Sequence, residues 1–401
     1  MRGKRGNIYN HIDHILLFPV IILIGIGLVA IYSVMSNDYP DRVIPAMFQQ
    51  AIWILLGCGL AGVLMFCTTK FLWKATPIFY AIGLILLVLP LYFYSPSLVA
   101  STGAKNWITV EGLTLFQPSE FMKIAYILML ARFSIWFQQK NTQNSLDADW
   151  NLLGIYSLIT LPVLILLALQ RDLGTSIVFL SILVGVIILS GISWWIILPF
   201  AGGFLVLFVL FLGIFLMPSG KEFLYHMGMD TYQINRILSW IDPFSYAKTI
   251  AYQQTQGMIS IGTGGLTGKG FNHLELSVPV RESDMIFTVI AEDFGFIGSA
   301  FILGLYLILI YRMLKVTLES NNKFYSFISV GFTMMLLFHV FENIGATIGI
   351  LPLTGIPLPF ISQGGSSLVS NLIGVGIVLS IYYQNKIKNE QRIDDYFKQF
   401  E

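Results

Sequence analysis

Asp284 is the residue best placed to do chemistry, because it stands where the longest polar interval of the sequence meets an apolar run. That run, Met285 to Tyr311, is interrupted only by the acidic pair Glu292-Asp293. Charges are costly in hydrocarbon, so this carboxylate should lie where the membrane meets water. There it would be able to take a proton from a hydroxyl group of a lipid-borne substrate. A helix N-cap is the structural alternative, and the residues alone leave both open.

Cations near the same boundary would stabilise negative charge on a phosphate or pyrophosphate group. Glu120 and Lys123 are three residues apart at the start of another apolar run, so they share one helix face. They either neutralise each other near the interface, or Lys123 faces a cavity and binds phosphate while Glu120 fixes its position. The candidate cations on the side of Asp284 are Lys123, Lys105, Arg236 and Lys269.

Two polar patterns have two interpretations each. Residues 262–270 are rich in glycine, but the residue after Lys269 is not the Ser or Thr of a phosphate-binding loop, and no strand precedes them. They form either a flexible turn or a loop whose N–H groups and lysine approach an anionic headgroup. His339, Glu342 and Asn343 share one helical stripe, which suits either a proton relay or a hydrogen-bonded structural cluster.

The composition places the chain among polytopic membrane proteins, since 56% of its 401 residues are hydrophobic and only 11% are charged. A formal net charge of +1 gives no electrostatic case for nucleic acid as a partner. Cys58 and Cys67 lie too far apart along one expected helix to form a disulfide, and two thiols make no metal site. No cluster of ligands at metal spacing requires a cofactor, although a divalent cation, Mg²⁺ or Mn²⁺, would be able to assist at a pyrophosphate.

The apolar runs predict an all-α fold, a polytopic membrane domain of about ten transmembrane helices. Basic residues cluster in alternate loops and at the ends, which places both termini in the cytoplasm. The expected spans are residues 15–34, 46–67, 76–96, 118–137, 152–170, 174–190, 194–216, 285–312, 324–350 and 367–384.

The loops expected on the outer side carry most of the polar motifs. Residues 217–284 form a large structured extracellular loop, in which amphipathic patterns at 229–241 and 247–261 predict helices lying on the membrane surface. Residues 351–366 contain three prolines and three glycines, so they cannot form a continuous helix. Irregular backbone at membrane depth is tolerated only inside protein or along a cavity, so this segment should wall the pocket that Asp284 faces.

Six motifs follow one another along the chain: Gln117–Lys123, Gln170–Thr175, Arg236–Pro243, Gly262–Gly270, Asp284–Phe287 with Glu292 and Gly295, and Pro352–Ser367. Together they resemble the SEDS family (shape, elongation, division and sporulation), and its RodA branch more than its FtsW branch. The resemblance covers nearly the whole chain. Four sites depart from the family pattern: Asn106 stands where Arg is common, Arg171 where Pro is common, Gln363 where Tyr is common, and Glu282-Ser283 where His-Thr is common.

This resemblance implies a GT-C-like membrane peptidoglycan glycosyltransferase that uses lipid II as both donor and acceptor during cell elongation and shape maintenance. The active site would face the outside of the cytoplasmic membrane, with Asp284 as its catalytic residue. The implied partners are a class B penicillin-binding protein, which crosslinks the glycan, and other membrane proteins of the elongation complex. Substrate and pyrophosphate would be bound by Lys123, Glu120, Lys105, Arg236, Lys269 and Ser366.

One carboxylate suffices for such a transfer, because a polyprenyl pyrophosphate is already a good leaving group and needs no protonation. Asp284 would take the proton of the acceptor hydroxyl as its oxygen attacks the anomeric carbon. The rival hypothesis is a flippase for the lipid-linked precursor, which needs a polar path through the bilayer instead of charges gathered at one face. A third hypothesis, a scaffold for wall enzymes, predicts that Asp284 is dispensable.

Overall fold

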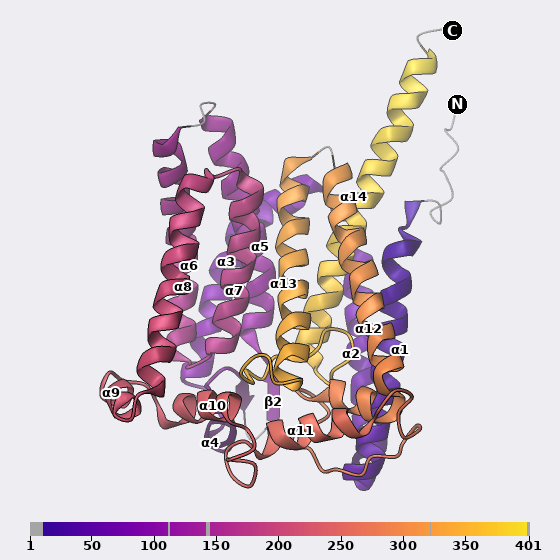
Figure 1. The fold of residues 1–401 in the computed structure, drawn as a ribbon. Helices are drawn as coiled ribbons and strands as arrows, with labels where there is room; N and C mark the ends of the chain where they lie inside the picture. The colour runs from indigo at the N-terminus through magenta and orange to yellow at the C-terminus, as the bar shows by residue number, and fades with distance from the viewer. Residues whose placement is uncertain (1–10, 111–112, 142–144, 321, 399–401) are drawn as a thin grey trace.

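The computed structural model describes residues 11–110, 113–141, 145–320 and 322–398. Within these residues ten long helices form one bundle, and the short elements gather at one of its ends (Figure 1). α1 begins and α14 ends at the opposite end. The long helices are α1 (His14–Asp38), α2 (Val43–Met65), α3 (Thr69–Val88), α5 (Pro118–Lys140), α6 (Leu146–Leu169), α7 (Leu173–Ser190), α8 (Trp194–Leu216), α12 (Ile286–Glu319), α13 (Lys323–Thr347) and α14 (Gly365–Lys398).

Nine helices of the described chain are long and apolar enough to cross a membrane by themselves, and α5 is the long helix left out. α5 carries Glu120, Lys123 and Arg132, but it packs against α3, α13, α6, α7 and α14. Glu120 and Lys123 are only 6% and 2% exposed. Neighbouring helices therefore shield these charges from lipid, which allows a helix of lower hydropathy inside the bundle.

Each of the ten predicted spans overlaps one long helix, but the third prediction, 76–96, is displaced. The helix begins at Thr69, because the Thr68 hydroxyl accepts a hydrogen bond from the N–H of Phe71 (3.4 Å) and caps it. It ends at Val88 and continues into a 3₁₀ turn, Leu89–Leu91. Lys70 and Lys74 precede the predicted span, but in the structure they lie in the first turns of α3. Their long side chains can extend from there toward water.

The short elements come from the polar intervals of the sequence. The two predicted amphipathic helices are present as α10 and α11, although α11 starts later than expected. The sequence did not predict the other short helices or an antiparallel hairpin, whose strands pair Ile108 with Phe116. The short elements, predicted and unpredicted together, are α4 (Pro96–Thr102), β1 (Ile108–Val110), β2 (Leu113–Phe116), α9 (Gly220–His226), α10 (Thr231–Ile241), α11 (Tyr252–Thr263) and the 3₁₀ turn Pro40–Arg42.

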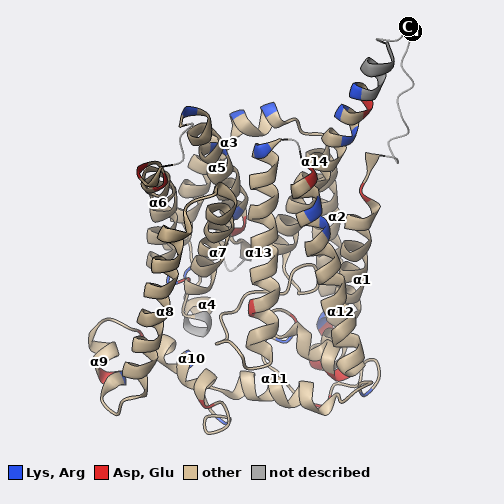
Figure 2. Ribbon diagram, turned by 45° about the horizontal axis from the view of Figure 1, so that its top comes forward, with Lys and Arg blue, Asp and Glu red and all other residues tan. Residues whose placement is uncertain are grey.

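Lysine and arginine mark the end of the bundle where α1 begins and α14 ends (Figure 2). Arg312 of α12 is nearly buried there, and its Nε donates to Asp13 Oδ2 at the start of α1 (2.7 Å). The predicted topology, with both termini in the cytoplasm, rests on this clustering of basic residues at one end. The basic residues before His11 lie outside the described residues.

α12 is broken at Gly295, and the glycine-rich loop 264–270 enters the break. The loop carbonyls of residues 265 and 266 accept hydrogen bonds from the N–H groups of Phe296 and Ile297 (2.9 and 3.1 Å). In return, the N–H groups of residues 269 and 270 donate to the carbonyls of residues 292 and 293 (2.8 and 3.1 Å). The loop thus satisfies backbone groups on both sides of the break, as burial away from water requires. The loop is therefore fixed by hydrogen bonds to α12. It is neither the flexible turn nor the headgroup-binding loop considered from the sequence.

Gly295→Ala should destabilise the protein. Gly295 has φ 63° and ψ −157°, and an added Cβ would lie 2.4 Å from the backbone nitrogen of Gly268. Such a conformation alone costs a non-glycine residue about 1–3 kcal/mol. Thermal unfolding in detergent measures the effect, and Gly304→Ala on the same helix is the control, because nothing lies within 4 Å of its added Cβ. Equal melting temperatures for the two variants would contradict the prediction.

Candidate active site

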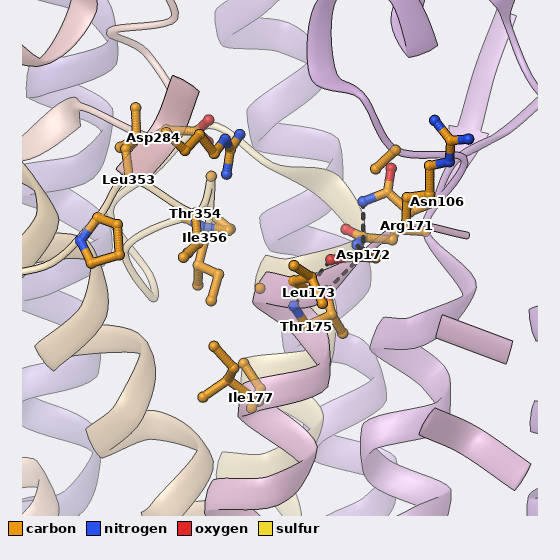
Figure 3. Close-up of a pocket in the computed structure, with 18 of the residues that line it drawn as sticks. Asn106, Arg171, Asp172, Leu173, Thr175, Ile177, Asp284, Leu353, Thr354 and Ile356 are labelled. Atoms are coloured by element: carbon orange, nitrogen blue, oxygen red, sulfur yellow. Dashed lines mark hydrogen bonds between the residues drawn. The ribbon is translucent and has the colours of Figure 1, made fainter. Parts of the chain in front are cut away.

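A cavity of about 480 Å³ opens at the end of the bundle that carries the short elements. Its walls come from α5, α7, α10, α13 and the segment 352–364, so distant parts of the chain meet there. Figure 3 shows Asp284 on one wall and Asn106, Arg171 and Asp172 on another. Of the residues predicted to act on substrate, four line this cavity: Asp284, Glu120, Lys123 and Arg236.

Asp284 lies in the turn before α12, and its carboxylate does not cap that helix. The N-cap residue is Met285, and the helix has no side-chain cap. The Asp284 carboxylate instead accepts a hydrogen bond from the Ser283 hydroxyl (2.8 Å). The N-cap alternative considered from the sequence is therefore wrong, and one carboxylate oxygen remains directed at the cavity side near Gly355.

Burial raises the pKa of Asp284, while the Ser283 hydrogen bond and the charge of Arg236 oppose this rise. Gly355 packs beneath these groups: a Cβ there would lie 3.3 Å from Asp284 Oδ2 and 3.9 Å from Arg236 Nη2. Its φ of 82° also favours glycine. Arg236 is oriented by Tyr232, whose hydroxyl accepts its hydrogen bond and whose ring lies under its guanidinium (4.6 Å). The result is a carboxylate and a guanidinium side by side on one wall.

Asn343 of α13 positions Asp284 through the backbone. Its Nδ2 donates to the Asp284 carbonyl and to the Ile356 carbonyl, both at 2.8 Å. One residue earlier, Glu342 accepts hydrogen bonds from the N–H of Thr354 (3.2 Å) and from its hydroxyl. Consecutive residues of α13 thus hold the proline-rich segment and the turn of Asp284 together.

Lys123 lies deeper, in a buried group with Glu120 and His339. Its Nζ is 2.8 Å from Glu120 Oε2 and 3.1 Å from His339 Nε2. His339 Nδ1 faces the Met335 carbonyl at 2.6 Å, so Nδ1 must carry the hydrogen and Nε2 must accept from Lys123. The three residues of the sequence stripe on α13 therefore bind separate sets of partners and not one another. This favours the structural cluster over a proton relay.

Three predicted site residues lie outside the cavity lining. Lys105 Nζ lies over the Tyr94 ring (4.3 Å), and Ser366 Oγ accepts from the N–H of Gln117 at the cavity edge (3.4 Å). Lys269 Nζ binds Glu275 and Glu292 (2.8 and 3.0 Å). The sequence could not show this, because the partner of Lys269 comes from α12.

Glu292 belongs to a second buried cluster that the sequence analysis missed. It pairs with Arg281, and both side chains are fully buried. Arg281 also donates to Ser260 Oγ (2.8 Å), Thr288 Oγ1 (3.2 Å) and the Leu276 carbonyl (2.9 Å). A buried arginine with this many partners fixes the chain three residues before Asp284, so this cluster supports the site without lining the cavity.

The far wall of the cavity is organised by Asp172, the N-cap of α7. It accepts hydrogen bonds from the N–H and hydroxyl of Thr175 (3.0 and 2.8 Å) and from Asn106 Nδ2 (2.8 Å). Gln117 Nε2 approaches the same carboxylate (3.5 Å). The motif Gln170–Thr175 was the sequence signal for this wall, but Asn106 and Gln117 come from elsewhere in the chain.

Fold and site together define a polytopic membrane enzyme with its charged groups gathered at one end of a helix bundle. The profile of the family described as "Cell cycle protein", FtsW/RodA/SpoVE, matches residues 14–387. The peptidoglycan glycosyltransferase MrdB of Escherichia coli K12 is 33% identical over 94% of this chain and 95% of its own.

Solved structures similar to this one include two that bear on the family. One is described as "Structural coordination of polymerization and crosslinking by a peptidoglycan synthase complex"; it has a TM-score of 0.73 at 28% identity and covers 93% of this chain and 98% of that chain. RodA of Thermus thermophilus has a TM-score of 0.63 at 26% identity, with 92% and 96% covered. The chain belongs to the FtsW/RodA/SpoVE family, as the motifs predicted, and is a peptidoglycan glycosyltransferase.

Asn343→Leu should lower activity through the position of Asp284. The substitution keeps the side-chain size but leaves two buried carbonyls without their donor, at about 1–3 kcal/mol for each unpaired group. A catalytic group displaced by ~1 Å can cost on the order of 10²-fold in rate. The measurement is glycan polymerisation beside thermal unfolding, with Phe341→Leu, 56% exposed on the same helix, as the control. Equal activity of the two variants would show that Asn343 does not position the carboxylate.

Proposed function

We propose that Asp284 is the general base with which this enzyme polymerises lipid II into glycan strands. The observation that carries the proposal is the free carboxylate: α12 does not use it as a cap, and it lies on the cavity wall beside Arg236. Burial raises the pKa of Asp284 in spite of the opposing Ser283 hydrogen bond and Arg236 charge, and the higher pKa makes the carboxylate a better proton acceptor.

The reaction needs one proton transfer. Asp284 accepts the proton of the acceptor sugar's hydroxyl while that oxygen attacks the anomeric carbon of the donor. The bond from this carbon to the pyrophosphate oxygen breaks, and the polyprenyl pyrophosphate leaves without protonation. Arg236 and Lys123, both at the cavity, stabilise the negative charge that develops, and Glu120 holds Lys123 in place.

The cavity is proposed to face the outside of the cytoplasmic membrane. Lysines and arginines cluster on helix ends and short loops at the other end of the bundle (Figure 2), and such clusters beside membrane-spanning helices stay in the cytoplasm. Similarity to a peptidoglycan synthase complex supports a class B penicillin-binding protein as the partner that crosslinks the product. Similarity to MrdB and RodA supports a role in elongation beside other membrane proteins of that machinery.

A divalent cation, Mg²⁺ or Mn²⁺, would depend on the substrate for most of its ligands. In the described residues, no three His, Cys, Asp or Glu side chains come together. The pyrophosphate oxygens would supply oxygen ligands of the kind such cations prefer. The residues therefore suit a cation that arrives with the substrate.

A flippase is the weaker alternative, because the cavity is closed toward the basic end. Beyond the buried pair of Lys123 and Glu120, α5 and α13 pack directly: a Cβ on Gly331 would lie 2.7 Å from the Ile127 side chain. Most residues buried at this level are apolar, namely Ile127, Leu128, Leu130, Phe332 and Met335. The buried hydroxyl of Thr333 donates to the Ser329 carbonyl of its own helix (2.7 Å). A transport path would need polar groups through this layer.

Asp284→Asn should abolish polymerisation. The amide keeps the size of the side chain but cannot accept the proton, and loss of a general base typically costs about 10²–10⁴-fold. The assay is lipid II polymerisation by the purified protein with its partner, whose own glycosyltransferase domain, where present, is inactivated. Asp242→Asn, in the same extracellular interval but outside the cavity lining, is the control. A folded Asp284→Asn enzyme with wild-type activity would sink the proposal.

The pH dependence of the reaction should also report Asp284. The base works only when deprotonated, so kcat/KM falls as pH drops through its pKa, which lies above the ordinary Asp value of about 3.9. Ser283→Ala removes a hydrogen bond that lowers this pKa, so the acid limb of the pH profile should move to higher pH. An acid limb that stays in place would mean that another group controls it.

A further inference from the structure

Arg171 stands at the mouth of the cavity in a backbone conformation unusual for its type. Its φ is 60°, in the left-handed region that favours glycine. The turn between α6 and α7 imposes it: the N–H groups of Arg171 and Asp172 donate to the carbonyls of Ala168 and Leu167, both at 3.0 Å. A long cationic side chain is thereby held at the cavity wall opposite Asp284 (Figure 3).

The acidic partner of Arg171 is Asp230, just before α10. Arg171 Nη1 lies 2.9 Å from Asp230 Oδ2, and the two side chains are 59% and 43% exposed. Asp172 is adjacent in sequence, but its carboxylate already accepts from Thr175 and Asn106. Exposed ion pairs contribute little stability because water screens them. Arg171 can therefore exchange Asp230 for another anion at low cost.

The other cavity cations are held more firmly. Lys123 pairs with Glu120 where the side chains are 3% and 7% exposed, and separating a buried pair leaves a charge without a partner. Arg236 is held by Tyr232 beside the Asp284 carboxylate. Arg171 also borders a second, smaller pocket of about 250 Å³ together with Asp230 and Tyr232. Of these three cations, Arg171 is the one that an incoming anion reaches most easily.

We propose that Arg171 binds the pyrophosphate of the lipid substrate at the mouth of the cavity. Its ion pair with Asp230 breaks when the pyrophosphate binds. A guanidinium group presents two parallel N–H donors, which match phosphate oxygens. This inference rests on the proposed function, because it assigns the binding of the same substrate.

Arg171→Gln and Asp230→Asn form a matched pair of variants with opposite expected effects. Arg171→Gln removes the binding group, so KM for lipid II should rise by about 10- to 100-fold with kcat little changed, in line with the loss of a charge-assisted hydrogen bond. Asp230→Asn removes the competing negative charge but keeps a side-chain oxygen for the N-cap of α10, so KM should fall or stay equal. If the pair merely fixes the turn to α10, both variants raise KM alike and lower the melting temperature alike, which would overturn the inference.

Binding without turnover separates this inference from the proposed function. In the Asp284→Asn background, Arg171→Gln should weaken binding of farnesyl pyrophosphate about tenfold or more and leave binding of farnesol unchanged. Arg171→Gly, which relaxes the left-handed backbone while removing the cation, should behave like Arg171→Gln if charge is the cause. Equal affinity of wild-type and variant Arg171 for farnesyl pyrophosphate rejects the Arg171 inference alone. Polymerisation by Asp284→Asn rejects the role of Asp284 and leaves the binding result standing.

Discussion

Two irregular segments of backbone, the turn that carries Asp284 and the proline-rich segment 352–364, meet on the side chain of Asn343. Its amide donates to one carbonyl of each segment. Irregular backbone buried in a membrane protein persists only where protein groups satisfy it. α13 therefore acts as the frame of the site, and the glycine-rich loop does the same for the break in α12 at Gly295. Asp284 itself lies on a turn, but that turn is fixed by α13 through Asn343 and leads directly into α12.

The charges of the site differ in how firmly they are paired, and this order follows burial. Glu120 and Lys123 are deepest and bind each other, whereas Arg171 and Asp230 meet at the exposed mouth. Asp284 lies between these extremes, with one hydroxyl donor and a guanidinium nearby but no full ion pair. A carboxylate in a tight salt bridge would be a poor base, because the partner cation lowers its pKa. The incomplete pairing of Asp284 supports its proposed role as the proton acceptor.

The sequence predicted the bundle because long apolar runs specify helices in a membrane almost without regard to their neighbours. It also predicted that Asp284, Lys123, Glu120 and Arg236 belong to one site, and all four line the cavity. It failed where a side chain's partner comes from a distant element: Lys269 points to Glu292 of α12, away from the cavity. The N-cap alternative for Asp284 depended on where α12 starts to within one residue, and periodicity does not resolve helix ends to that degree.

The departures from the family pattern at Asn106 and Arg171 are explained by the geometry of one wall. The short amide of Asn106 reaches Asp172, whose carboxylate also caps α7. A proline at position 171 would have its φ fixed near about −65°, which the observed φ of 60° excludes. The turn is therefore built differently from one that contains proline, and it accommodates a long side chain at the cavity mouth. The cation missing at position 106 has a counterpart at position 171 on the adjacent turn, so this wall carries the positive charge of Arg171.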